Sequence, residues 1–174
     1  MPPVIDAHHS FWDPEARDYP WLKGDLAMLR RRFGPDDLAP ELAGEQVSGT
    51  VLVQTLPRAD ESEALLELAA AMSFVRGVVG WVDLTAPDVA GQVERLRSGP
   101  GGELLVGVRH RVHDEPDPDW LGRADVRRAL HALGEAGLAF DLQVRARELP
   151  CLLYTSDAAD EGVEVWVWVG GGGG

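Results

Sequence analysis

The chain has 174 residues, which makes it one domain by length or part of a larger one, because α/β barrels commonly need about 250 residues to close. Its net charge of −13 repels polyanions and argues against nucleic acid as a partner. The sequence has no membrane-spanning apolar stretch, no export signal and only one cysteine, so we expect a cytoplasmic protein with neither a membrane partner nor a disulfide framework.

Apolar runs alternate with helical patterns from residue 4 to about residue 149. The patterns predict strands over 4–8, 50–56, 78–84, 104–110 and 138–144, and helices over 36–44, 59–72, 88–98 and 125–137. Gly137 is placed to end the last helix. Apolar strands separated by helices indicate a parallel sheet covered by helices. A glycine-rich phosphate loop does not follow the first strand, so the sequence favours a partial (β/α)8 TIM barrel with about five of the eight βα units.

Polar side chains stand at or near the ends of the predicted strands. They are His8, Gln54, Asp83, Arg109, His110, Asp141 and Gln143. In a barrel, the C-terminal ends of the strands converge on one mouth, where the chemistry takes place. A structural interpretation stays open for several of them: Asp83 as a helix cap, Gln54 as a tie for a loop, and Asp141 as a hydrogen-bonded core carboxyl.

The order and spacing of several motifs resemble a known family. The motifs are IDAHHSFWDPEARDYPWL, VLVQ, GVVGWVDL, LVGVRH and DPDWL. They resemble the amidohydrolase-related family of barrel-fold metal-dependent hydrolases, in particular its branch of fuconolactonase-like and dicarboxylate lactone hydrolases, from about residue 4 to residue 149. The resemblance implies a (β/α)8 barrel that hydrolyses a small ring ester or related bond with water as the nucleophile. Its partner is then a small-molecule substrate, and the oligomeric state is left open.

The first strand departs from the family's pattern at one position. In that family the strand ends in an H-x-H pair whose imidazoles bind a divalent metal or line the site. His8 matches the first position, and the second falls on Ser10, which supplies no nitrogen ligand. We therefore expect a zinc-like metal at His8 to be weakened by Ser10, whose hydroxyl can still hydrogen-bond a substrate. Strand alternation predicts that His9 points away from His8.

Hydrolysis of a lactone requires a positioned water, a base and donors that face the developing oxyanion. We expect His8 and His110 to be catalytic, by orienting water or polarising the carbonyl, and Arg109 to anchor a substrate carboxylate. The predicted substrate-binding residues are Ser10, Gln54, Arg109 and Asp141. The resemblance further implies an aspartate at the end of the last barrel strand as base and another histidine from a later strand, and neither has a counterpart here.

Two other functions stay open at this point. A decarboxylase of the same superfamily shares the barrel but would keep a complete metal pair at the first strand, and Ser10 counts against it. A non-catalytic binding module would use the barrel mouth only to hold a ligand. A late-strand aspartate and histidine in a longer sequence would favour hydrolysis, and their absence would favour binding.

Residues 151–174 differ in style from the rest of the chain, which contains a single lysine among its 16 basic residues. The segment CLLYTSDAADE resembles the translation of a transposase-end sequencing adaptor, and VEVWVWV with five glycines resembles low-complexity read-through. We therefore predict a barrel fragment over 1–150 and a non-native tail over 151–174. The competing interpretations are a flexible glycine tail and a short edge strand from VEVWVWV. With five of eight strands, we expect the polypeptide to fold poorly and to be inactive alone.

Overall fold

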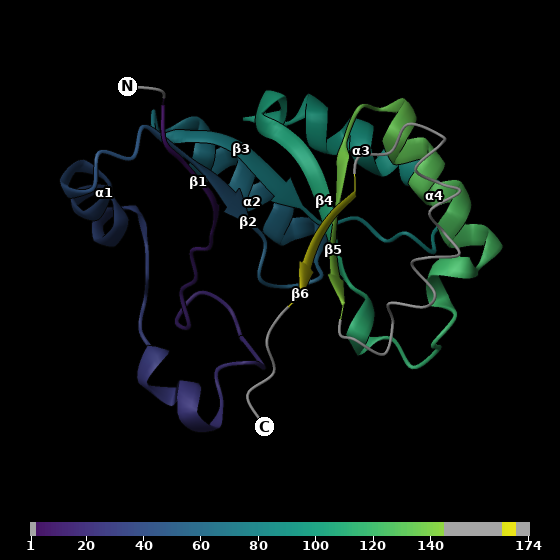
Figure 1. The fold of residues 1–174 in the computed structure, drawn as a ribbon, viewed down its shortest axis with the longest axis horizontal. Coiled ribbons are helices and arrows are strands. Elements are labelled where there is room, and N and C mark those ends of the chain that lie inside the picture. The colour runs from purple at the N-terminus through teal and green to yellow at the C-terminus, as the bar shows by residue number, and fades with distance from the viewer. Residues whose placement is uncertain (1–2, 145–164, 170–174) are drawn as a thin grey trace.

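The computed structural model describes residues 3–144 and 165–169, the latter as backbone only. Its strands form one parallel sheet in the order of the sequence (Figure 1). They are β1 Ile5–His9, β2 Gly49–Val53, β3 Val75–Gly80, β4 Leu105–Arg111, β5 Ala139–Val144 and β6 Val165–Val169. The α-helices are α1 Pro35–Gly44, α2 Ala59–Ala70, α3 Val89–Ser98 and α4 Ala124–Glu135. The five predicted strands and four predicted helices are all present, and consecutive strands pair in parallel.

The main hydrophobic core lies between the sheet and helices α2, α3 and α4. Leu52, Val78 and Val108 are fully buried from neighbouring strands, and Leu133 of α4 is fully buried against them. This packing explains why the strands read as apolar runs and the helices as amphipathic patterns. No helix within the described ranges is long and apolar enough to cross a bilayer.

The third strand ends earlier than predicted, at Gly80 rather than at residue 84. Directly after Gly80, the side chain of Ser62 in α2 replaces a neighbouring strand as the hydrogen-bond partner of Trp81. The Ser62 Oγ accepts from Trp81 N at 2.7 Å and donates to Trp81 O at 3.1 Å. Asp83 consequently sits in a turn, where its Oδ1 accepts from the backbone N and the hydroxyl of Thr85. The interpretation of Asp83 as a helix cap is wrong, because Asp88 caps α3.

The end of α4 follows the sequence prediction. Gly137 has a φ of +66°, a left-handed conformation that glycine adopts without steric strain. Its N–H bonds to the carbonyl of Gly134 at 2.8 Å, and the chain then enters β5. Gly137 therefore ends the helix and turns the chain back toward the sheet.

Residues 10–34 form a lobe beyond the carboxyl ends of the strands (Figure 1). The lobe contains the 3₁₀ helix Gly24–Leu29 and closes on itself through the antiparallel bridge between Trp12 and Phe33. A small core joins the lobe to the loop after β2: it consists of Tyr19, Leu22 and Leu56, with Trp12, Trp21 and Leu29 packed against them. The lobe directly follows β1, and its sequence includes Pro14 and Pro20 beside the two tryptophans.

Strand β6 pairs in parallel with β5 and lies within the segment VEVWVWV. It corresponds to the edge strand that the sequence offers as one interpretation of that segment. Residues 151–164 and 170–174 lie outside the described part of the chain. The non-native origin of residues 151–174 stays a prediction.

Candidate functional site

The two adjacent histidines of β1 face opposite sides of the sheet. His8 Nε2 lies 3.1 Å from Nη1 of Arg109, which belongs to β4. His9 Nε2 lies 2.9 Å from the Thr50 hydroxyl, and its ring packs edge-on against Phe11 in the main core. The predicted alternation is confirmed, and His8 is the histidine on the concave face.

Arg109 of β4 and Asp141 of β5, which are register partners, form a buried ion pair. Nε and Nη2 of Arg109 lie 2.9 and 2.6 Å from Oδ2 of Asp141, and the two side chains are 8% and 15% exposed. Since His8 faces the remaining guanidinium nitrogen, the cluster joins β1 to β4 and β5 across the concave face. A contact between β1 and β4 that bypasses two strands requires a strongly curved sheet.

His8 is a neutral donor and acceptor in this cluster. Burial, and after it the charge of Arg109, lower the pKa of His8. A guanidinium has no acceptor, so Nε2 of His8 must accept from Arg109 and the ring proton must reside on Nδ1. The Nδ1–H group is then the part of His8 that can donate to a ligand.

Ser10 and Gln54 stand beside this cluster at the ends of β1 and β2. The Ser10 hydroxyl donates to the carbonyl of Val53 at 2.8 Å, so it keeps only acceptor capacity for a ligand. Gln54 is 5% exposed, and its backbone N–H bonds to Val79. Both side chains reach the same pocket, as the sequence predicts for two strand ends.

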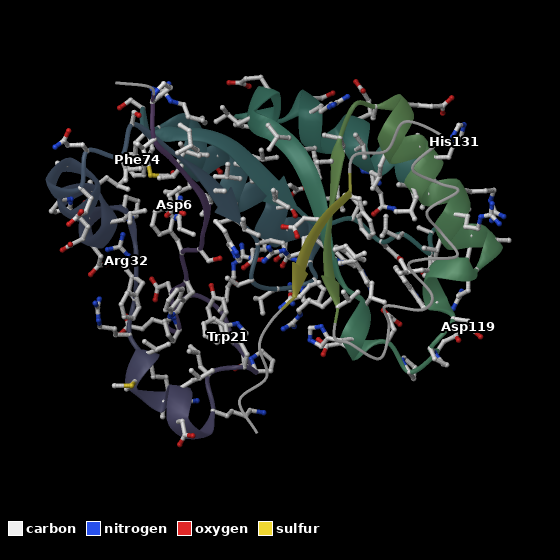
Figure 2. All side chains as sticks on the ribbon, viewed as in Figure 1. Asp6, Trp21, Arg32, Phe74, Asp119 and His131 are labelled. Carbon is white, nitrogen blue, oxygen red and sulfur yellow. The ribbon has the colours of Figure 1, made fainter. Side chains whose placement is uncertain are left out.

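The pocket has a volume of about 280 Å³. It is lined by Ser10, Trp21, Gln54, Thr55, Arg109, Arg111 and Gln143. Trp21 comes from the lobe of residues 10–34, and Figure 2 shows it between the lobe and the strand ends. A space of this size fits a single small ring or a short chain of about ten heavy atoms.

Sequence reasoning missed three lining residues, and it named a fourth, Gln143, among the strand-end polar residues without giving it a role. Arg111 and Gln143 lie two positions beyond Arg109 and Asp141, so strand alternation places them on the same face. Thr55 directly follows Gln54, and its hydroxyl also bonds to Glu61 at 2.6 Å. Trp21 carries no local signal, because only the folding of the lobe brings it to the strand ends.

The structure does not bring His110 to the pocket, and its catalytic role stays a prediction. Its ring stacks on Trp120 with centroids 4.2 Å apart and planes 7° apart, and its Nε2 lies 2.7 Å from Glu115. Burial lowers its pKa against the opposing effect of Glu115, so the neutral ring donates to that carboxylate. The physical reason is alternation: with Arg109 and Arg111 on the concave face, His110 must face the helices.

The residues at His8 do not fit the expected zinc-like ion as they are arranged. Of the two imidazole nitrogens of His8, Nε2 faces the Arg109 guanidinium, and a cation placed there would meet a second cation. The Ser10 hydroxyl donates its proton to the backbone carbonyl of Val53 and supplies no nitrogen ligand for a metal. Within the described residues no cluster of three or more His, Cys, Asp or Glu side chains could hold a metal ion.

The site's described side chains supply binding groups rather than a free base. Gln54, Gln143 and Ser10 offer amide and hydroxyl groups, while Arg109 is compensated by Asp141. The neutral amide and hydroxyl groups suit a ligand with several hydroxyl or carbonyl oxygens, and Arg111 adds a positive charge to the lining.

The sequence profile of the amidohydrolase family matches residues 5–161. An L-fucono-1,5-lactonase of Burkholderia ambifaria is 40% identical over 86% of this chain and 50% of its own length. An L-fucono-1,5-lactonase of Burkholderia multivorans is 36% identical over 84% of this chain and 48% of its own length. The chain therefore spans about half the length of these curated relatives.

A solved structure of an amidohydrolase from Burkholderia multivorans superposes with a TM-score of 0.82 at 33% identity, over 91% of this chain and 54% of that one. It was solved with bound HEPES, and a second crystal form contains bound zinc. The superposition confirms the predicted fold class: strands β1–β5 are a parallel half-barrel that matches part of a TIM-barrel hydrolase.

Proposed function

This chain belongs to the amidohydrolase family, and from that premise we propose that it is the N-terminal part of a hydrolase that opens a small sugar lactone by attack of water at the barrel mouth. The observation that carries the proposal is the pocket at the strand ends, whose groups are mostly neutral hydrogen-bonding ones. A polyhydroxylated lactone ring matches these amide and hydroxyl groups. The two lactonase relatives support the same substrate class.

The reaction adds one water to the ring ester. The water oxygen bonds to the carbonyl carbon, the ring C–O bond breaks, and the ring oxygen takes a proton to become a hydroxyl. The new carboxyl group then ionises and releases a proton to the solvent. We assign the Nδ1–H of His8 to the carbonyl or to the attacking water, and Ser10 and Gln54 to the substrate hydroxyls.

Arg109 and Asp141 act on the substrate through His8 in this proposal. The guanidinium holds the His8 ring by its Nε2, and Asp141 holds the guanidinium. The base that takes the proton of water is not among them, because Asp141 and His8 Nε2 both face Arg109.

A free base would have to come from the barrel units that the longer relatives carry. We propose accordingly that residues 1–150 are a barrel fragment and that residues 151–174 are not native to it. Resequencing the locus from source DNA tests the second point: tail codons contiguous with the gene would refute it.

The experiment that tests the function pairs this chain with the C-terminal half of the Burkholderia ambifaria lactonase, because each covers what the other lacks. We expect the assembled barrel to hydrolyse L-fucono-1,5-lactone, seen as acidification in a pH indicator assay, and the chain alone to be inactive. A decarboxylase would consume a proton instead, and a binding module would bind without a pH change. A folded, stoichiometric complex that leaves the lactone intact would refute the proposal.

A further inference from the structure

We infer that Arg111, and not Arg109, provides the charge in this pocket that binds a carboxylate, and that it holds the carboxylate of the ring-opened aldonate. The inference rests on the proposed lactonase function, because ring opening is what creates that carboxylate. It also replaces the expectation from the sequence that Arg109 is the anchor.

Arg109 is poorly suited to bind a second anion. Two of its nitrogens face one oxygen of Asp141, and the third faces His8. The positive charge of the guanidinium is thus balanced by a carboxylate that is itself only 15% exposed. A ligand carboxylate at Arg109 would meet the charge of Asp141 at short range, which opposes its binding.

Arg111 differs in each of these respects. It lies two residues further along β4, lines the same pocket and has a side chain that is 33% exposed. The contact given for its ion pair joins Nε to Oδ2 of Asp114 at 3.2 Å. Within the described ranges, neither Nη1 nor Nη2 donates a hydrogen bond, and these are the two nitrogens that form a fork for a carboxylate.

Asp114 holds Arg111 in place without fully neutralising it. The Asp114 carboxylate is 53% exposed, and its other oxygen lies 3.2 Å from Nε2 of His113. One exposed carboxylate is therefore shared between two basic side chains, and water screens its charge. Arg111 keeps its orientation toward the pocket and retains most of its attraction for an anion.

The neighbours of Arg111 complete a site for an aldonate. Gln143 of β5 and Gln54 beyond β2 line the same pocket and offer amide groups to hydroxyls of an open sugar chain. The lactone is uncharged and the product is an anion, so the positive charge of Arg111 attracts the product more strongly than the lactone. The residue is therefore a specificity determinant that favours the carboxylate form over neutral sugars.

The test compares two probes that differ only at C1, which is a carboxylate in L-fuconate and an uncharged hydroxymethyl group in L-fucitol, by calorimetric titration of the full chain. We expect wild type to bind L-fuconate more tightly than L-fucitol. Arg111→Gln should weaken L-fuconate about tenfold and leave L-fucitol unchanged, while Arg111→Lys keeps part of the preference. Arg76→Gln is the matched control, since Arg76 is an exposed strand arginine that does not line the pocket.

Three results would overturn the inference. The first is that wild type binds both probes equally, or binds neither. The second is that Arg111→Gln leaves the affinity for L-fuconate unchanged. The third is that Arg76→Gln loses as much L-fuconate affinity as Arg111→Gln, which would indicate a general charge effect. Circular dichroism of each variant checks folding. The hydrolysis assay with the assembled barrel is read independently: charge-dependent binding without hydrolysis would refute the lactonase function while leaving Arg111 as a carboxylate site.

Discussion

The two faces of the sheet hold similar residues for different purposes at the carboxyl ends of the same strands. On the concave face, His8 and Arg109 meet Asp141 beside an open pocket. On the helix face, His9 bonds to Thr50 and packs in the core. Adjacent residues in one strand thus enter two environments, one shaped by charge pairing and the other by packing.

Residue type alone therefore does not identify a site residue in a barrel strand. His8 and His110 both look catalytic from their position at a strand end, but only His8 contacts a residue that lines the pocket, Arg109. The ring of His110 instead helps to fix the turn after β4 to the helix layer through Trp120 and Glu115. The partners of a side chain, more than its chemistry, decide what it can do.

Removing the charge of Arg109 should cause the largest loss of stability on the concave face. Arg109→Met leaves Asp141 buried without its partner, and we expect the free energy of unfolding to fall by about 3 to 5 kcal/mol in urea titrations. The double variant with Asp141→Leu should regain most of the loss. Arg111→Gln serves as the control, because its exposed ion pair is worth at most about 1 kcal/mol. A fully stable Arg109→Met would show that the pair is solvated.

Truncating His110 should have a smaller effect, and only on stability. His110→Ala loses the stack on Trp120 and the bond to Glu115, for which we expect about 2 kcal/mol. His110→Phe retains the stack and should lose less. Neither variant should change the affinity for L-fuconate, because His110 does not line the pocket. A loss of L-fuconate affinity in His110→Phe would show that His110 takes part in ligand binding.

Strand and helix existence could be predicted because burial imposes a period on the sequence. The five strands of the half-barrel are continuous apolar runs, and the helices between them show one apolar face. The boundary of β3 could not be predicted, because it depends on a hydroxyl of α2 that binds the backbone at Trp81. Boundaries set by tertiary contacts leave no local pattern.

The candidate site was predictable only where alternation was applied consistently. The rule separates His8 from His9, but Arg109 and His110 were both expected at the mouth although adjacent residues cannot face one side. The same rule, applied two residues on, leads to Arg111. The Arg109–Asp141 pair joins neighbouring strand ends at the same register, whereas Trp21 depends on how a long segment folds back and has no signal in the sequence.

His9 on the helix face should make the free energy of unfolding depend on pH. Burial lowers the pKa of His9 to about 4. The unfolded chain binds a proton near pH 6.5 and the folded chain does not, so stability is complete above pH 6.5 and is lost as the pH falls toward 4. The slope for one group is at most about 1.4 kcal/mol per pH unit.

His9→Leu should flatten that slope in urea titrations performed across the acidic range. Part of the slope should remain, because the pKa values of His8 and His110 are lowered as well and act with the same sign. Arg76→Gln, on an exposed strand position, is the control and should leave the slope unchanged. An identical slope in His9→Leu would mean that His9 is protonated in the folded chain.

The smallest expected effect compares one hydroxyl on each face. Thr50→Val removes the partner of His9 Nε2 at a fully buried position and should cost about 1 kcal/mol. Ser10→Ala removes a bond to the Val53 carbonyl at the rim of the pocket, where water can replace the hydroxyl, and should cost less. In a His9→Leu background the cost of Thr50→Val should largely vanish, since the pair no longer exists. Equal costs for the two hydroxyls in wild type would show that water reaches both faces alike, and the contrast between a packed face and an open one would then fail.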